Sequence, residues 1–317
     1  MSEKQNRKVL RAPLIVVIGP TAVGKTGLAI ESALALDGEI VSADSRQVYR
    51  YMDIGTAKPT AQQRAQSPHY LLDVVDPGEI LSVARYQKMA YDAIGGIQSR
   101  NLVPFLVGGT GQYITAVIEG WSIPEVPPNP ALRTELEALA SQKGLEALFQ
   151  RLTQLDPAAA EKIDPHNVRR VVRAIEVCIE SGQRFSELQR KKPPPYDILL
   201  YGLTMERDAL YEQADNRVDE MMQHGFLDEV RHLLNMGCSR KLPSMSGLGY
   251  AQLAAHLLDG VPLDEAITLT KYATHDFIRR QYTWFRGHDQ GILWHNIRGV
   301  DVKGLIDSTQ RWLEEYR

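Results

Sequence analysis

The stretch GPTAVGKT, from Gly19 to Thr26, most constrains this chain, because it follows an apolar run and precedes a helical pattern. Two glycines let the backbone curl so that successive N–H groups converge on phosphate oxygens, while the next helix contributes its positive end. A glycine turn between strand and helix is the alternative, but an eight-residue match in this context predicts a P-loop that binds a polyphosphate. The predicted phosphate-binding residues are Gly19, Pro20, Thr21, Ala22, Val23, Gly24, Lys25 and Thr26.

Length and composition narrow the class of protein. A chain of 317 residues exceeds the usual size of one domain, so we expect one large domain with an insertion. Its net charge of −3 gives no overall cationic field, so contact with nucleic acid requires a local basic patch. Cys178 and Cys238 lack the CxxC spacing of zinc sites and are interpreted as buried or incidental thiols. Without an apolar run of transmembrane length, and with a polar, basic N-terminus, we expect a cytoplasmic protein with no membrane partner.

Strand-like apolar runs at 14–18, 39–43 and 102–107 alternate with helical runs in the first third of the chain. This alternation predicts an α/β fold with a parallel sheet covered by helices. Ligands of such sheets bind beyond the carboxyl ends of the strands. The P-loop, the turn at 44–45 and the Gly-Gly-Thr segment 108–110 all follow strands, so we expect them to converge.

Prolines that follow Trp121 mark a domain boundary, and a helical pattern runs from about 130 to 190 with Gly144 and Gly182 as stops. We interpret 121–195 as an inserted helical subdomain. The core then comprises 1–120 and 196–317. In its second part we expect a strand at 198–203, helices at 207–223, 226–236 and 263–286, and a short strand near Ile292.

Asp44 directly follows the second predicted strand, which makes it a candidate general base near the bound phosphates. By position alone, Ser42, Asp44 and Ser45 could equally cap a helix or form a turn. The neighbouring sequence decides, since DSRQVY at 44–49 and MDIGTAKP at 52–59 resemble the signature of tRNA dimethylallyltransferases, also called tRNA isopentenyltransferases. The resemblance continues over nearly the whole chain, at His69, 73–77, 108–113, 216–222 and 249–250.

The resemblance to this IPP transferase family implies a P-loop NTPase-like, kinase-like core with an inserted helical domain that binds tRNA. It implies transfer of a dimethylallyl group from dimethylallyl diphosphate to the N6 amine of the adenosine 3′-adjacent to the anticodon. The expected partners are therefore tRNA and dimethylallyl diphosphate, the expected cofactor is Mg²⁺, and we expect a monomer. This reaction needs stabilisation of the departing diphosphate and removal of the amine proton.

Lys25, Mg²⁺ held at Thr26 and the P-loop amides meet the first need, and Asp44 meets the second. The resemblance adds Thr110 and Arg217 as catalytic residues near the diphosphate. Without the resemblance, Thr110 could equally well be the N-cap of the next helix. Arg217 would then be interpreted as a solvent-exposed helix residue. Gln47 and Tyr49 are candidates for positioning the adenosine, which must leave its stack to reach a buried site.

Two basic segments resemble RNA-contacting parts of the family, and a solvated helix face is the alternative for each. The predicted tRNA-binding residues are Asp44, Ser45, Arg46, Gln47, Val168, Arg169, Arg170, Val171, Val172, Arg279, Arg280 and Gln281. Arg184 and the segment 190–192 add positive charge to the inserted subdomain. Two positions depart from the family pattern, since Ala251 and His275 stand where the family usually has basic residues.

Three other classes compete with this interpretation. A nucleotide kinase would use the same P-loop with ATP, but the strand at 102–107 lacks the acidic end that such enzymes usually have. A prenyltransferase acting on free adenine nucleotides would need no inserted arginine-bearing subdomain. A non-catalytic RNA-binding module would have no use for Lys25, Thr26 and Asp44 together.

Overall fold

The computed structural model describes residues 11–124, 126–188, 193–194, 196–288 and 291–316. The chain divides into two compact units, Met1–Ile118 with Pro194–Arg317 (the core unit), and Glu119–Pro193 (the inserted unit). The sequence prediction had put the inserted part at 121–195. Arg190, Lys191 and Lys192, predicted to add positive charge, lie outside the described residues.

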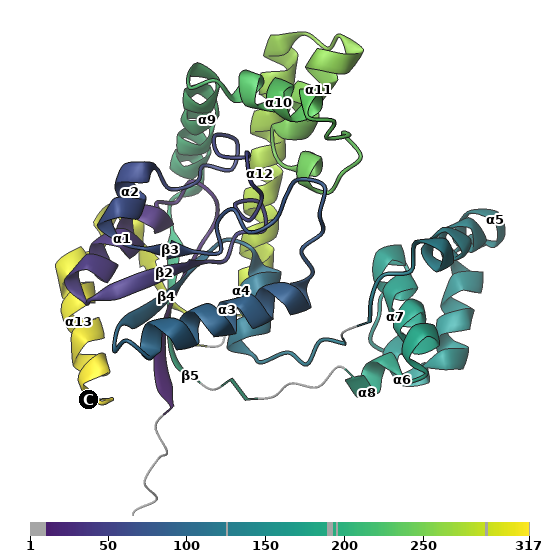
Figure 1. Cartoon of the computed structure of the whole chain (residues 1–317), viewed down its shortest axis with the longest axis horizontal. Helices are drawn as coiled ribbons and strands as arrows, with labels where there is room; N and C mark the ends of the chain where they lie inside the picture. The colour runs from purple at the N-terminus through teal and green to yellow at the C-terminus, as the bar shows by residue number, and fades with distance from the viewer. Residues whose placement is uncertain (1–10, 125, 189–192, 195, 289–290, 317) are drawn as a thin grey trace, which may run out of the picture. The chain divides into compact units, whose positions relative to one another are not determined.

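The core unit contains a six-stranded parallel sheet with the order β3-β2-β4-β1-β5-β6 (Figure 1). Val16 of the central strand packs on one face of the sheet and Val17 on the other, as expected for a strand buried on both sides. The strands are β1 (Ala12–Ile18), β2 (Gly38–Ser42), β3 (His69–Tyr70), β4 (Val103–Gly108), β5 (Tyr196–Thr204) and β6 (Leu293–Asn296).

Helices cover both faces of this sheet, and each face has its own apolar core. On one face pack α1 (Lys25–Ala35) and α13 (Val302–Glu314), and on the other α3 (Val83–Gln98) and α4 (Gly111–Ile118). The remaining helices of this unit are α2 (Ala61–Gln66), α9 (Arg207–Gln223), α10 (Phe226–Asn235), α11 (Tyr250–Asp259) and α12 (Leu263–Gly287), with 3₁₀ turns at Ser244–Ser246 and Ile297–Gly299.

The predicted parallel α/β fold is confirmed. Its strands at 14–18, 39–43, 102–107 and 198–203 lie within one or two residues of the observed ones, and β6 is the short strand expected near Ile292. The long helix expected at 263–286 is α12. Helices α2, α11 and α13 were not predicted from the sequence. No helix in the described part of the chain is long and apolar enough to cross a membrane.

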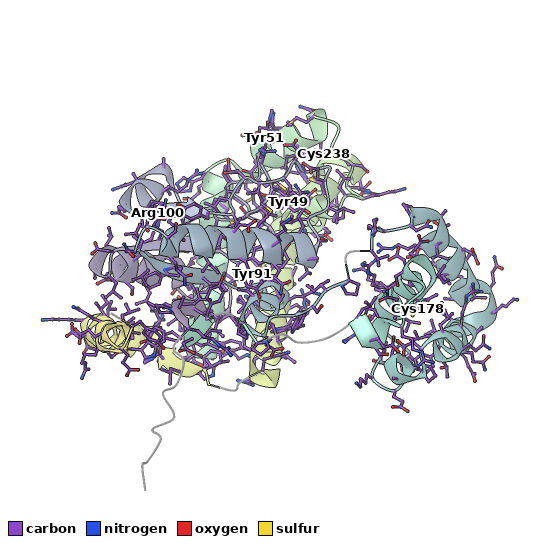
Figure 2. All side chains as sticks on the ribbon, turned by 60° about the horizontal axis from the view of Figure 1, so that its bottom comes forward. Tyr49, Tyr51, Tyr91, Arg100, Cys178 and Cys238 are labelled. Carbon is purple, nitrogen blue, oxygen red and sulfur yellow. The ribbon has the colours of Figure 1, made fainter. Side chains whose placement is uncertain are left out.

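The inserted unit consists of α5 (Pro130–Leu155), α6 (Pro157–Ala160), α7 (Val168–Ser181) and α8 (Phe185–Leu188). Gly144 breaks α5 with a φ of 86°, and Gly182 ends α7 with a φ of 66°, as predicted. Cys178 lies in this unit and Cys238 in the core unit, both as buried free thiols (Figure 2). These cysteines are therefore not partners in a disulfide.

Helix α7 presents two different faces. Val171 and Val172 are 0% and 3% exposed and pack in the core of the inserted unit. The helical period turns both side chains away from solvent, and their predicted contact with tRNA stays a prediction. Arg169 and Arg170, directly before them in the chain, are exposed, and Val168 packs partly against the same core.

Glu176 is the central polar group of the inserted unit. Its fully buried carboxylate accepts from Arg133 Nε at 2.8 Å, Arg173 Nη1 at 2.6 Å and the backbone N–H of Asn129 at 2.7 Å. Although burial opposes ionisation, these donors together lower the pKa of Glu176 to about 2. The carboxylate thus joins the start of α5 to α7.

We predict that Glu176→Gln lowers the free energy of unfolding of the inserted unit by about 3 kcal/mol, because two arginines lose their buried counter-charge. Since the pKa of Glu176 is lowered in the folded state, its contribution is fully present above pH 4.5 and is lost as the pH falls through about 2. Urea unfolding followed by circular dichroism at pH 7 and pH 3 tests both statements. Equal stability of the two proteins at pH 7 would contradict the first.

Candidate active site

Three segments meet at the carboxyl edge of the sheet, because β4 lies between β1 and β2. The N–H of Ala43 donates to Val107 O at 2.7 Å, and the N–H of Thr110 donates to Ala43 O at 3.1 Å. Asp44, Thr110 and the P-loop therefore follow three neighbouring strands. The predicted convergence is confirmed.

The P-loop has the curled backbone that phosphate binding requires. Ala22 and Gly24 adopt φ values of 65° and 98°, and α1 begins at Lys25. Gly19 has no room for a side chain, since a Cβ there would lie 2.7 Å from Leu203 O. Lys25 Nζ donates to Pro20 O at 2.7 Å. The loop wraps over the positive end of α1, where an anion is stabilised.

Gln281 of α12 bridges two of these segments. Its Oε1 accepts from the N–H of Thr21 at 2.8 Å, and its Nε2 donates to Gly109 O at 2.8 Å. The side chain is 6% exposed, with both ends of its amide occupied. Gln281 thus ties the P-loop to the segment that follows β4, and its contact with tRNA stays a prediction.

Burial and neighbouring charges shift the pKa values of the two cations of the site, Lys25 and Arg217. Burial lowers the pKa of Lys25 to about 7, although nearby Asp44 raises it and Arg217 lowers it further. Burial also lowers the pKa of Arg217 on α9, against the opposing charges of Asp44 and Glu220. Within the described residues, neither cation forms an ion pair with a carboxylate. Two partly buried cations near one carboxylate leave an excess of positive charge, which favours an anion.

Asp44 has one oxygen committed to a turn, since Oδ1 accepts from the backbone N–H groups of Arg46 at 2.8 Å and Gln47 at 3.3 Å. Thr110 Oγ1 accepts from the N–H of Ser45 at 2.9 Å and donates to Ser45 Oγ at 3.2 Å. Thr110 thus fixes the turn that orients Asp44. The turn interpretation of Asp44 holds in the structure, and it aims the carboxylate at the sheet edge.

Gln47 also serves the loop that follows. Its Nε2 donates to Thr56 O and Ala57 O, each at 3.2 Å, and its Oε1 accepts from Ser42 Oγ at 3.1 Å. Because these bonds occupy the side-chain amide, Gln47 stabilises the residue 44–59 segment, which we call the signature loop.

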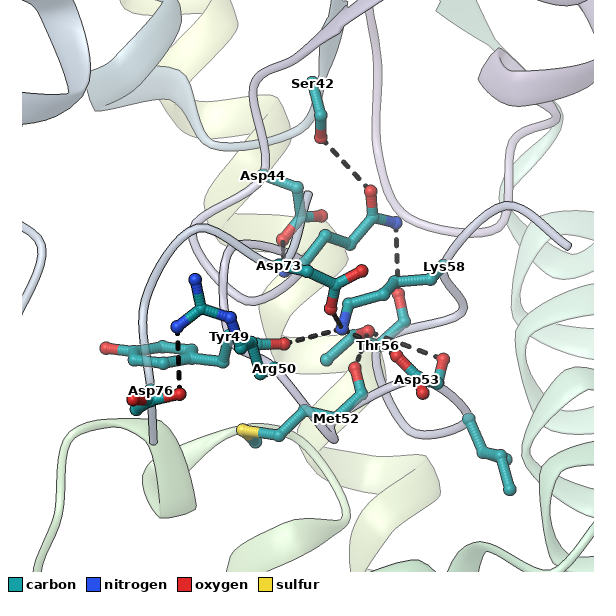
Figure 3. Close-up of polar contacts among 12 residues, drawn as sticks. Ser42, Asp44, Tyr49, Arg50, Met52, Asp53, Thr56, Lys58, Asp73 and Asp76 are labelled. Atoms are coloured by element: carbon teal, nitrogen blue, oxygen red, sulfur yellow. Dashed lines mark hydrogen bonds and ion pairs between the residues drawn. The ribbon is translucent and has the colours of Figure 1, made fainter. Parts of the chain in front are cut away.

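Lys58 is the internal cation of the signature loop (Figure 3). Its side chain is 2% exposed, and Nζ donates to Tyr49 O at 2.5 Å, Asp53 Oδ1 at 2.7 Å and Asp73 Oδ1 at 2.5 Å. From the other side, Glu229 of α10 accepts from three consecutive N–H groups, those of residues 53, 54 and 55, at 2.7–3.1 Å. Tyr250 donates to the same carboxylate at 2.6 Å.

The contacts of Lys58 and of Glu229 with the signature loop were not predicted from the sequence. Lys58, Asp53 and Asp73 all lie in segments that carried the family resemblance, which was a signal for Lys58. No sequence signal pointed to Glu229, because a glutamate in an amphipathic helix is usually a solvent-exposed residue.

A pocket of about 50 Å³ opens between the P-loop, the signature loop, α9 and α12. Thr21, Ala22 and Arg217 line one part of it, and Gly55 and Thr56 line another. Thr26 faces a second, smaller cavity of about 20 Å³, which it shares with Ser42 and Gln47.

The other predicted RNA contacts lie on the core unit. Arg46 donates to the backbone of Pro243 and to Ser246 Oγ, so its guanidinium is engaged within the protein. Arg279 pairs with Asp276 on exposed α12, and Arg280 next to it is exposed. His275, where the family usually has arginine, bonds Asp215 at 2.8 Å and stacks on Tyr211, which makes it a packing residue.

A family model described as IPP transferase matches residues 47–288, more than half of the chain. The chain belongs to the IPP transferase family. Among curated relatives, the tRNA dimethylallyltransferase of Roseiflexus castenholzii is 54% identical over 86% of this chain and 90% of that protein. The tRNA dimethylallyltransferase of Dehalococcoides mccartyi is 44% identical over 96% of this chain and 94% of that protein.

Solved structures of IPP transferase relatives extend the likeness to the fold. The tRNA isopentenylpyrophosphate transferase of Bacillus halodurans is 39% identical, with a TM-score of 0.71 over 96% of both chains. A eukaryotic dimethylallyltransferase solved acting on tRNA is 25% identical, with a TM-score of 0.76 over 95% of this chain and 78% of that one. The core unit is therefore a P-loop NTPase-like fold, as predicted.

We predict that Lys58→Met lowers the free energy of unfolding by about 2–4 kcal/mol, because Asp53 and Asp73 lose the buried cation between them. Arg50→Met is the matched control, since its pair with Asp76 joins side chains that are 43% and 58% exposed. Exposed pairs contribute about 0–1 kcal/mol. Thermal unfolding of both variants distinguishes them, and equal losses would contradict the special role of Lys58.

Proposed function

We propose that this protein transfers a dimethylallyl group from dimethylallyl diphosphate to N6 of the adenosine 3′-adjacent to the anticodon of tRNA. The observation that carries this proposal is the grouping of Lys25, Arg217 and Asp44 beside the P-loop. It combines two cations for an anionic leaving group with one carboxylate for a proton. The names of relatives that are 44–54% identical over most of this chain support it.

Groups present in the site account for each bond, charge and proton that changes in the reaction. The N6 lone pair forms a bond to C1 of the allylic chain, the C1–O bond breaks, and its electrons leave with the diphosphate. The P-loop N–H groups, Lys25 and Arg217 stabilise the charge that develops on the leaving oxygen. Asp44 takes the proton from N6. Thr110 keeps Asp44 oriented through the turn at Ser45.

Mg²⁺ fits the donors available at the P-loop. No group of three His, Cys, Asp or Glu side chains that could hold a metal occurs in the described part of the chain. Mg²⁺ is commonly held by few protein ligands together with substrate phosphates and waters, and Thr26 supplies a hydroxyl for such a site. When bound, Mg²⁺ would neutralise negative charge on the diphosphate.

The alternatives fit the site less well. A nucleotide kinase usually has an acidic residue at the end of a central strand, whereas β4 ends at Gly108 and is followed by Gly109 and Thr110. A free adenine nucleotide would not require a separate unit with exposed Arg169 and Arg170. We also propose, from the sequence, that the protein acts as a monomer in the cytoplasm.

The direct test incubates the purified protein with Mg²⁺, unmodified tRNA and radiolabelled dimethylallyl diphosphate, beside a parallel reaction with labelled ATP. Prenyl label in tRNA is the expected result. Phosphate transfer from ATP without prenyl label would assign the protein to the kinases, and prenyl label on free adenine nucleotides alone would remove tRNA as the substrate.

We predict that Asp44→Asn lowers the rate of transfer by about 10²–10⁴-fold, because the amide cannot accept the N6 proton. The amide oxygen can still accept the turn bonds from Arg46 and Gln47, so tRNA binding should change little. Single-turnover transfer and a filter-binding assay measure the two effects, with exposed Asp76→Asn as control. Parallel loss of binding and transfer would contradict the assignment of Asp44 as general base.

We predict that Arg169→Glu combined with Arg170→Glu weakens tRNA binding and flattens its dependence on salt, because fewer phosphate contacts release fewer counterions. Arg311→Glu, a charge reversal on exposed α13, is the control. Dissociation constants at several salt concentrations test this. If the double variant keeps the wild-type affinity, the two arginines form only a solvated face.

A further inference from the structure

The pocket beside the P-loop changes character along its length. Thr21 and Ala22 of the P-loop and Arg217 form its polar end. Val218, Met221 and Phe226 line it as well and are apolar. A ligand with a charged head and a hydrocarbon tail fits such a pocket, provided the apolar residues lie away from the phosphates.

The course of helix α9 places the apolar residues of the pocket away from the P-loop. In the first half of the helix, Gln213 Nε2 donates to Ala22 O at 2.6 Å, which anchors this part of α9 to the P-loop. From Gln213 to Met221 an α-helix advances about 12 Å. The helix ends two residues after Met221, and Phe226 begins α10. Moving along α9 from the P-loop therefore leads towards Phe226.

Helix α12 gives the same direction independently. Gln281 holds the P-loop at Thr21, and Thr274 and Thr270 line the pocket further along the helix. From residue 281 to residue 270 the helix spans about 16 Å. An ion pair of Lys271 with Asp219 at 2.7 Å holds the far parts of α12 and α9 together.

Phe226 closes the far end as a rigid wall. Its ring is 1% exposed and lies between two glycines, since a Cβ would come within 2.1 Å of the ring at Gly55 and within 2.3 Å at Gly249. Tyr250 contacts the ring edge-on, with 4.9 Å between the centroids. Glu229 in turn fixes the backbone of Gly55. These contacts with Gly55, Gly249 and Tyr250 hold the ring in place beside the pocket.

We propose that Phe226 sets the upper length of the prenyl chain, by admitting a five-carbon allylic chain and excluding a ten-carbon one through contact with its ring. This inference rests on the proposed function. The bonds that form and break are the same for both donors, because each loses diphosphate from C1 and gains N6 there. The two donors differ only in the length of the hydrocarbon chain that must fit against the ring of Phe226.

The test compares dimethylallyl diphosphate with geranyl diphosphate on the same tRNA, using wild type, Phe226→Leu and Phe226→Ala. We expect the ratio of kcat/KM for geranyl over dimethylallyl diphosphate to rise by at least about tenfold in Phe226→Ala and by less in Phe226→Leu. Phe285→Leu is the matched control, because Phe285 is also buried in this core but does not line the pocket. Its donor ratio should equal that of wild type.

An unchanged ratio in folded variants that still transfer dimethylallyl groups would overturn the role of Phe226. A rise of equal size in Phe285→Leu would overturn it too, because general loosening would then explain the effect. If Phe226→Ala fails to fold by circular dichroism, the ratio of Phe226→Leu decides alone. Failure of wild type to transfer dimethylallyl groups would instead contradict the proposed function.

Discussion

The parallel pairing of β4 between β1 and β2 is the constraint on which the site depends. It brings the ends of three strands to one edge, and the bonds from Ala43 to Val107 and from Thr110 to Ala43 extend that pairing beyond the strands. Nothing in the loops alone could hold a P-loop, a carboxylate and a hydroxyl at fixed spacing. Lys58 from within the signature loop and Glu229 from α10 hold that loop in shape, and Gln281 of α12 holds the P-loop.

Charge is arranged differently in the two units. In the inserted unit, Glu176 has arginine partners on each side, and the pKa of its carboxyl falls to about 2. In the site, burial lowers the pKa of both Lys25 and Arg217, and the opposing charge of Asp44 offsets this only in part. Satisfied charge stabilises a fold, whereas buried cations in excess favour an incoming anion.

Local signals predicted the sheet, the P-loop and the convergence of Asp44 with Thr110, because each depends on a short run and the strand before it. They failed where a residue's environment comes from a distant segment. Gln281 meets Thr21 across 260 residues, and Glu229 meets Gly55 across 174. Val171 and Val172 are buried for a nearer reason, since both side chains lie on the face of α7 that packs in the core of the inserted unit.

The insertion also affects how this chain can fold. β1 pairs with β4 on one side and β5 on the other, and the whole inserted unit separates β4 from β5 along the chain. The second pairing must therefore close a very long loop, at a cost in chain entropy. Because the inserted unit has its own apolar core, folding of this unit would bring its two ends closer together and reduce that cost. The inserted unit would then shorten the loop that must close before the final central strand pairs.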